Sequence, residues 1–515
     1  MAQELTYRLD DPRYTIYHRA ALGGLAATIR AWELRRTTPQ GVRAAFESDR
    51  VTLQWDDSSD RDALLRILSA SFQTRNDLID LPAQAPGGMG DDLRLALHNG
   101  YCGTYLQHNK MRPAPPGVKG AKTLTLRNPD TDAEEIFTYR PVGSYAHQKA
   151  QGTGLLDSDV LPATATISQA LVPGALTGAE ALEVPAKDAI LLLFLIAGST
   201  VFLLRPRAKN AKAQYCLIVP DVVDLRRFAR SIEMMAAGSS SVKTFSRTYL
   251  GRVVGGAEEA ALKFLIDIQA TTAVNDSPAV RGCLAISMGK VAWDGNQINR
   301  SAIVPVGRDH PELDVFKAAV QAIRAKTTRL KNGDSYAFPA SPLPELIAAN
   351  LAHDHHWAAH FRELVADKKD FQLMRFQHGG LVAMKNTIHD ETDQLFIDVF
   401  HEAWRFTMRG IFDDAKAPGV DAGRRLEVRR ERIRNEILRA KNQSQLAGWF
   451  LDFCARATDG QSLPKLRDPA RARRIRTFIF DERSFDRFQN LCLFALLSYS
   501  SDTDSGTDKV TDQGE

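Results

Sequence analysis

The hydrophobic pattern of this chain changes once, near residue 340, and this change limits the folds available to it. Before that point, strand-like segments are mixed with helix-periodic ones, whereas nearly every segment over 384–499 has the period of an amphipathic helix. A stretch with three prolines, 338–344, separates the two parts. Since 515 residues are too many for one compact core, we expect an α+β chain with a mixed α/β N-terminal domain and an all-α C-terminal bundle.

The expected domains are a mixed α/β domain over 1–340, a connecting segment over 341–384, a helical bundle over 385–500 and a disordered acidic tail over 501–515. In the bundle we predict helices over 385–413, 422–443, 446–457, 469–481 and 484–498. In the first domain we predict helices over 20–36, 62–72, 221–233, 257–269 and 314–326, and strands over 123–127, 135–139, 190–197, 201–204 and 215–219. A hairpin should join strands over 283–287 and 290–294.

The longest apolar run, 189–204, bears on membrane association. It is too short to span a bilayer and is broken by Gly198-Ser199-Thr200, so two buried strands joined by a tight turn are expected. The N-terminus has no basic segment followed by an apolar core, so no signal peptide is expected. The five cysteines are scattered without a C-x-x-C pair, which argues against a disulfide scaffold or a cysteine zinc site and favours the reducing cytoplasm.

Charge is distributed unevenly along the chain. The formal net charge is only +4, but the region 421–500 holds 17 Lys or Arg against 10 Asp or Glu. The tail over 501–515 reverses this balance, with five acids and one lysine. A basic helical domain that ends in an acidic tail fits a protein that contacts phosphates, although a solvated helical surface would have the same composition.

Several basic segments are candidate nucleic-acid-binding sites, because lysine neutralises phosphate while arginine and amides can pair with base edges. The first, 109–122, is rich in proline and glycine and should be an exposed loop with no acid of its own. An ordinary solvated surface would explain each segment taken alone. The candidate residues are Lys110, Arg112, Lys119 and Lys122; Arg207, Lys209, Asn210 and Lys212; Asn296, Gln297, Asn299 and Arg300; and, in the bundle, Arg424, Arg425, Arg429, Arg430, Arg471 and Arg474.

A histidine cluster is the sharpest sign of catalysis, since four of the twelve histidines fall within 353–360. On a helix, His356 and His360 would share a face at the spacing of a two-histidine metal site. A metal-dependent phosphohydrolase using His353, Asp354, His356 and His360 is therefore an alternative, but a polar helix with surface histidines explains the pattern better. The sequence has no Walker A, dinucleotide-binding or G-x-S-x-G motif, so we expect no catalytic site, cofactor or metal.

Four blocks of residues occur in the order and spacing of a known family. The blocks are Asp11-Pro12 with Thr15, His18-Arg19-Ala20 and Leu22-Gly23-Gly24-Leu25; Tyr139-Arg140-Pro141-Val142-Gly143-Ser144-Tyr145 with His147; Leu217-Ile218-Val219-Pro220-Asp221-Val222 with Asp224-Leu225 and Phe228; and Gly289 to Trp293 with Gln297 and Arg300. In these blocks the chain resembles the large subunit of type I CRISPR effector complexes (Cascade), in the Myxan subtype grouped with type I-B. Pro173-Gly174 departs from that family's pattern, which leaves the role of this loop open.

The resemblance implies a non-catalytic subunit of a cytoplasmic, RNA-guided antiviral complex. Its expected partners are guide RNA, the backbone and 5′-end subunits, duplex target DNA, the displaced strand and a separate helicase–nuclease that cuts. The subunit would read the protospacer-adjacent motif, help to separate the strands and stabilise the R-loop. The resemblance also implies that the helical bundle is similar to the small subunit, which could be translated internally from Met374 or Met384. A transposon-associated complex that recruits a transposition apparatus remains a further alternative.

Overall fold

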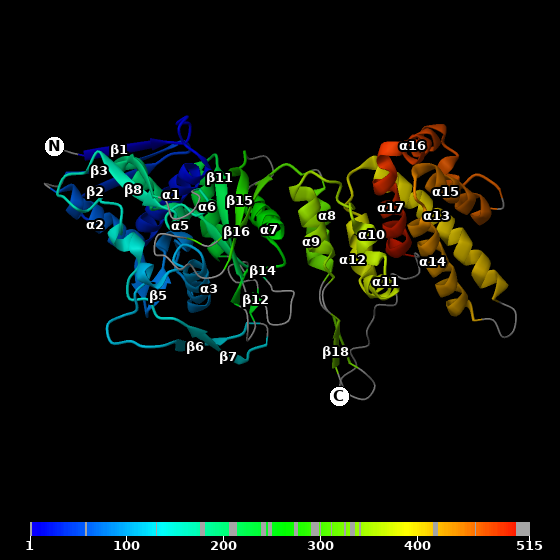
Figure 1. Cartoon of the computed structure of the whole chain (residues 1–515), viewed down its shortest axis with the longest axis horizontal. Helices are drawn as coiled ribbons and strands as arrows, with labels where there is room; N and C mark the ends of the chain where they lie inside the picture. Colours follow the sequence, from blue (N-terminus) through cyan, green and yellow to red (C-terminus); the bar gives the residue numbers. More distant parts are fainter. Residues whose placement is uncertain are drawn as a thin grey trace. The chain divides into compact units, whose positions relative to one another are not determined.

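The computed structural model describes residues 3–56, 59–129, 131–175, 181–204, 214–237, 244–245, 250–271, 277–289, 298, 300–310, 312–323, 326–329, 335–338, 341–415, 421–458 and 460–500. The chain divides into two compact units, 1–309 and 310–515 (Figure 1). The first unit mixes helices with sheets, and the second is almost entirely helical over its described part. The predicted α+β fold class is thereby confirmed.

The first unit contains three short 3-10 helices and seven α-helices among its described residues. Its helices are α1 (Ile16–Arg35), α2 (Asp60–Ser71), η1 (Pro82–Gln84), α3 (Asp91–Gly103), η2 (Asn109–Met111), η3 (Ala146–Lys149), α4 (Ala186–Leu192), α5 (Leu195–Gly198), α6 (Leu225–Ala237) and α7 (Ala257–Ala270). Its strands are β1 (Gln3–Arg8), β2 (Val42–Phe46), β3 (Arg50–Trp55), β4 (Gln73–Arg75), β5 (Leu78–Asp80), β6 (Lys122–Arg127), β7 (Glu134–Tyr139), β8 (Thr164–Ser168), β9 (Ala181–Pro185), β10 (Thr200–Leu204), β11 (Gln214–Val222), β12 (Thr244–Phe245), β13 (Leu250–Gly251), β14 (Val253–Val254), β15 (Val280–Met288) and β16 (Arg300–Gly307).

The main sheet of the first unit has the strand order β14-β10-β11-β15-β16. Only the β14–β10 pair is parallel, and the other neighbours are antiparallel. The strand predicted over 283–287 is confirmed as part of β15. The second strand of the predicted hairpin, 290–294, lies outside the described residues, and the strand that pairs with β15 after this segment is β16, which begins at Arg300.

Helix α1 is largely buried and packs against α4, α5, α6 and strand β11. Gly24 of α1 and Gly198 of α5 permit the packing of these two helices. A Cβ atom on Gly24 would lie 2.2 Å from the carbonyl oxygen of Phe194, and one on Gly198 would lie 2.0 Å from that of Ala20. Since side-chain carbons do not approach backbone oxygens so closely, the glycines allow the backbones of α1 and α5 to touch.

One strand prediction is wrong. The residues 190–197 form α4 and α5, and only Thr200–Leu204 of the apolar run is a strand, β10. The run is buried on all sides, from Ala189 to Gly198. A helix buried on every side has no polar stripe, so the sequence carries no 3.6-residue period that would distinguish it from a buried strand.

The second unit begins with α8 and continues through the proline-rich stretch. Its elements are α8 (Leu313–Ala322), β17 (Lys326–Arg329), β18 (Ser335–Phe338), α9 (Leu343–Ala352), α10 (Phe361–Val365), α11 (Lys368–Arg375), α12 (His378–Lys385), α13 (Glu391–Asp414), α14 (Ala422–Arg439), α15 (Gln443–Ala457), η4 (Pro464–Leu466), α16 (Pro469–Phe480), η5 (Glu482–Ser484) and α17 (Phe485–Ser498). The segment 341–384, for which we expected a connection, thus contains α9, α10, α11 and most of α12. Helix α8 packs on α9 and α12, within this unit.

Polar caps and a cluster of phenylalanines define the bundle. The side chains of Asp390, Asp421 and Asn442 accept hydrogen bonds from the first backbone N–H groups of α13, α14 and α15, which explains where these helices begin. The Asp390 cap also explains why 385–413, predicted as one helix, is divided between α12 and α13. In the core, the ring of Phe396 contacts that of Phe450 at 5.1 Å between centroids, and α13, α15 and α17 pack together (Figure 1).

Candidate nucleic-acid interface

The loop over 109–122 is the first candidate, and its cations fall into two groups. Lys110 and Lys119 are exposed, and within the described part of the chain neither side chain has an ion-pair partner. Arg112 is only 9% exposed and donates through Nε to the carbonyl oxygen of Leu106 at 2.6 Å, so it holds the loop in place. Lys122 begins β6 and forms an ion pair with Asp77. The expectation that no acid neutralises this loop is therefore wrong for Lys122.

Two of the other predicted segments lie mostly beyond what the structure describes. Arg207, Lys209, Asn210, Lys212, Asn296, Gln297 and Asn299 are all outside the described residues. Arg300 is partly buried at the start of β16. Burial raises the pKa of the Tyr17 phenol to about 12, and the nearby charge of Arg300 partly offsets this rise. The loop at Gly174 meets the same place, because a Cβ on Gly174 would lie 3.1 Å from the Tyr17 hydroxyl. Arg300 and the Pro173-Gly174 loop thus both lie near Tyr17 of helix α1.

Helix α14 presents the second group of candidate arginines. Arg424 and Arg425 are exposed in its first turn and have no ion-pair partner among the described residues. Arg429 is partly buried, and burial is the main cause that lowers the pKa of its guanidinium, with repulsion from Arg432 adding to it. Arg430 donates to Glu427 at 3.0 Å and lies over the ring of Trp404, so it is held by its neighbours. Arg424 and Arg425 are consequently the two cations of this helix best placed to meet a phosphate.

Helix α16 differs from α14 because both of its predicted arginines are paired. Arg474 lies 2.5 Å from Glu391, and Arg471 lies 3.5 Å from Asp468. Arg473 and Arg476, which were not chosen as site residues, are exposed and have no ion-pair partner in the described part of the bundle. The spacing of Asp468 and Arg471 gave a usable signal, since an acid three residues before an arginine on a helix pairs with it.

The histidine cluster does not have the geometry predicted for a metal site. Helix α9 ends at Ala352, so His356 and His360 lie in the connection to α10 and share no helix face; the polar helix that we preferred does not form either. His360 has a left-handed backbone (φ 61°) and pairs with Glu363. Over the residues that the structure describes, no three His, Cys, Asp or Glu side chains are grouped so that they could hold a metal ion.

His356 instead belongs to a buried ion-pair network. Its Nε2 lies 2.7 Å from Oδ2 of Asp393, a carboxylate that is completely buried. The indole of Trp357 donates to the same oxygen at 3.1 Å, and Arg487 donates to the other oxygen at 2.6 and 2.9 Å. A buried carboxylate needs such partners, so this network fixes the α9–α10 connection against α13 and α17.

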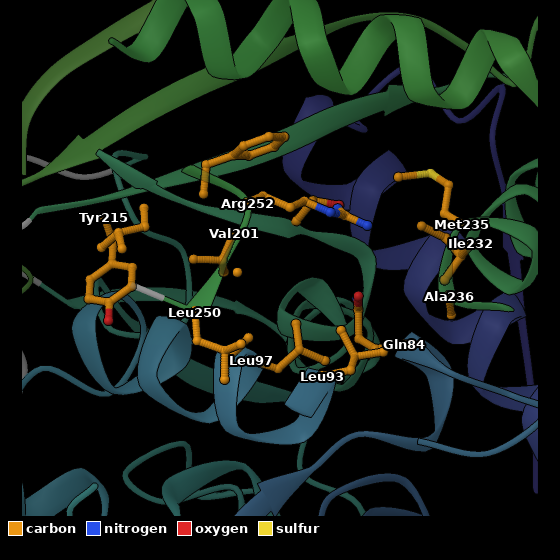
Figure 2. A pocket seen from close by; sticks show the side chains of 15 residues that line it. Gln84, Leu93, Leu97, Val201, Tyr215, Ile232, Met235, Ala236, Leu250 and Arg252 are labelled. Atoms are coloured by element: carbon orange, nitrogen blue, oxygen red, sulfur yellow. The ribbon is translucent and has the colours of Figure 1, made fainter. Parts of the chain in front are cut away.

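Arg252 lines a small cavity in the first unit. Figure 2 shows the guanidinium of Arg252 within the cavity, among side chains that include Gln84, Leu97 and Met235. The Nε of Arg252 is buried and has no hydrogen-bond partner among the described residues, and its guanidinium lies 5.8 Å from the centre of the Phe202 ring. The cavity volume of about 40 Å³ holds a few water molecules at most. The cavity is therefore too small for a nucleotide, and nucleic-acid contacts are expected on the surface.

Among the residues that the structure describes, no helix combines enough length with enough apolar character to cross a membrane.

Comparisons with known proteins identify the family. A model of the DevT N-terminal domain matches residues 6–193, and a model of the DevT C-terminal domain matches residues 384–515. The chain is also similar to a CRISPR-associated protein, Cas8a1/Csx13, of Myxococcus xanthus (strain DK1622), with 26% identity over 547 aligned positions that cover 96% of this chain and 88% of that protein. The chain therefore matches both DevT domain models and is similar over nearly its whole length to a CRISPR-associated protein, which confirms the resemblance predicted from its sequence.

Proposed function

We propose that this chain is the large subunit of a type I-B, Cascade-like complex that surveys DNA in the cytoplasm with a guide RNA. In this role it recognises the protospacer-adjacent motif, promotes strand separation and stabilises the R-loop. The observation that carries the proposal is the match to both DevT domains on one chain, together with the named relative. Base pairing with the guide then supplies most of the sequence specificity, and the protein needs to read only a short motif and the backbone.

The exposed cations support a division of labour between the two units. Lys110 and Lys119 on the first unit are proposed to meet duplex DNA, with Arg300 near the site of motif reading. Arg424 and Arg425 on the second unit are proposed to meet the displaced strand. Guanidinium and ammonium groups without an ion-pair partner among the described residues can bind phosphate without first breaking an ion pair, which favours Lys110, Lys119, Arg424 and Arg425 over their paired neighbours.

We propose that cutting is done by a separate helicase–nuclease that the complex recruits. The large subunit then contributes binding and positioning, and the histidine cluster contributes to the stability of the second unit through Asp393. Its remaining partners in this account are the guide RNA and the backbone and 5′-end subunits.

A separately translated small subunit is also part of the proposal, and the packing of α12 bears on its start. Leu381 of α12 is completely buried, and α12 packs against α17. A fragment that starts at Met384 loses this helix and exposes apolar surface of α17, whereas a fragment that starts at Met374 keeps it. We therefore favour Met374, and the intact mass of a co-purified C-terminal fragment distinguishes the two starts.

The proposal is tested by assembling the complex with and without this chain on matched DNA duplexes. One duplex carries the guide-matched target with its flanking motif, and the other carries the same target with a scrambled motif. We expect omission of the chain to abolish the preference for the motif while guide RNA stays bound to the other subunits. A motif preference that survives without the chain would contradict the proposed role.

A further inference from the structure

The second unit contains an open groove that none of the sequence predictions includes. Its volume is about 720 Å³, within the range of pockets that hold organic ligands, and residues of α11 to α14 and α17 line it. The walls combine apolar and polar side chains, and the apolar ones include Phe376, Met408, Phe412 and Leu426. Arg375 and Arg430 lie at the same groove.

Two phenylalanine rings of this groove are unusually exposed. Phe376 is 53% and Phe412 is 51% exposed, whereas Phe396 and Phe400, on the same helix as Phe412, are completely buried. Burying a phenylalanine side chain stabilises a fold, so large rings left at the surface along a groove are a feature of interaction sites. The exposed rings lie along a concave surface and not at scattered positions.

The charge beside these rings is positive. Arg375 and Arg430 both donate to the carboxylate of Glu427, at 2.5 and 3.0 Å, so two guanidinium groups share one negative charge. Each guanidinium has five N–H donors, and the bond to Glu427 does not use all of them. Arg424 and Arg425, which are unpaired among the described residues, are on α14, two and one residues before Leu426, which lines the groove.

We propose that this groove takes the unstacked bases of a single nucleic-acid strand whose phosphates lie against Arg375, Arg430 and the arginines at the start of α14. Aromatic rings accept the flat face of any base, and guanidinium groups beside them neutralise the backbone. The positive rim favours a polyanion over an apolar peptide helix, which needs no phosphate-binding groups around it. The inference rests on the proposed function and assigns a base-binding site to its strand-binding unit.

The test separates base stacking from phosphate contact by using two oligomers of equal length, oligothymidylate and an abasic DNA strand. With the purified full-length chain, Phe412→Ala should weaken binding of oligothymidylate about tenfold, since one stacked base contributes roughly 1–3 kcal/mol. Binding of the abasic strand should change less than about twofold because its phosphates remain. Phe412→Tyr should retain the affinity of the unmodified chain, because the ring is kept.

Val428→Ala is the matched control, because Val428 is a 62% exposed apolar residue on α14 that does not line the groove. It should change neither affinity. If Phe412→Ala weakens both oligomers equally, or neither, the proposal is wrong. If it leaves both unchanged and instead weakens binding of the other subunits, the groove is a protein-docking surface. The double variant Arg424→Ala with Arg425→Ala tests the strand-binding role of the second unit itself. If this variant loses affinity for the oligomers and Phe412→Ala does not, the groove proposal is wrong but the proposed function stands.

Discussion

The pairing state of the arginines predicts which of them bind a displaced strand. Arg424 and Arg425 are exposed and unpaired in the described bundle, whereas Arg471 and Arg474 lie 3.5 and 2.5 Å from carboxylates. For a single strand, the slope of log K against log salt changes by about 0.7 for each phosphate neutralised. Replacing Arg424 and Arg425 by alanine should therefore flatten the slope by about 1.4 and, near physiological salt, weaken binding about tenfold.

The double variant Arg471→Ala with Arg474→Ala is the matched comparison, because it also removes two positive charges from the second unit. Its slope should change by less than about 0.7, since each of these guanidinium groups must leave a carboxylate before it can meet a phosphate. The assay is fluorescence anisotropy of a labelled oligothymidylate between about 50 and 200 mM salt. An equal or larger effect for the α16 pair would refute the reasoning and make net charge alone responsible.

Three further predictions concern the first unit. Gly24→Ala should lower the thermal midpoint, because the added carbon would meet the Phe194 carbonyl and overpacking costs about 1–3 kcal/mol. Gly448→Ala, a control on α15 of the second unit with nothing within 4 Å of the added carbon, should leave the midpoint equal or higher. Equal midpoints for both variants would contradict the close helix contact. Lys119→Ala should weaken binding of the assembled complex to duplex DNA and flatten the slope of log K against log salt by about 0.9. Lys122→Ala should have a smaller effect, because the Lys122 ammonium is paired with Asp77. Equal losses would contradict the distinction between free and paired lysines. Burial lowers the pKa of His98 to about 4, whereas the pKa in the unfolded state is about 6.5, so between these values the unfolded state binds a proton that the folded state does not. Stability should therefore fall as pH drops from about 7 to 5, and it should fall less steeply in His98→Gln. Calorimetry at several pH values measures this difference.

Much of the fold was predictable because it depends on local patterns. The helices of the second unit follow from apolar periodicity, and the start of α14 follows from its cap residue Asp421. The cap Asn442 was missed, because the prediction placed it inside a helix over 422–443 and began the next helix at 446, whereas α15 begins at Gln443. The segment 190–197 was misassigned because its helices are buried on every side, so only tertiary packing distinguishes them from strands. The contact between α1 and α5 was not predicted either, because it depends on how these helices pack in the folded chain.

The candidate site was predictable as a set of basic segments but not residue by residue. Whether a cation is free depends on acids far away in the sequence: Lys122 pairs with Asp77, and Arg474 pairs with Glu391. The same limit applies to His356, whose partner Asp393 comes from α13. The groove at Phe412 needed the structure as well, since a phenylalanine near the end of an amphipathic helix looks like a core residue in the sequence.

The central claim is that this chain works inside an RNA-guided complex, and co-purification tests it most directly. The full-length chain would be tagged and purified from cells that also carry its neighbouring genes, and the bound nucleic acid would be extracted and sized. The account predicts a discrete short RNA, the other subunits and a C-terminal fragment whose mass reports its start. A chain that purifies alone and free of RNA from such cells would contradict the account.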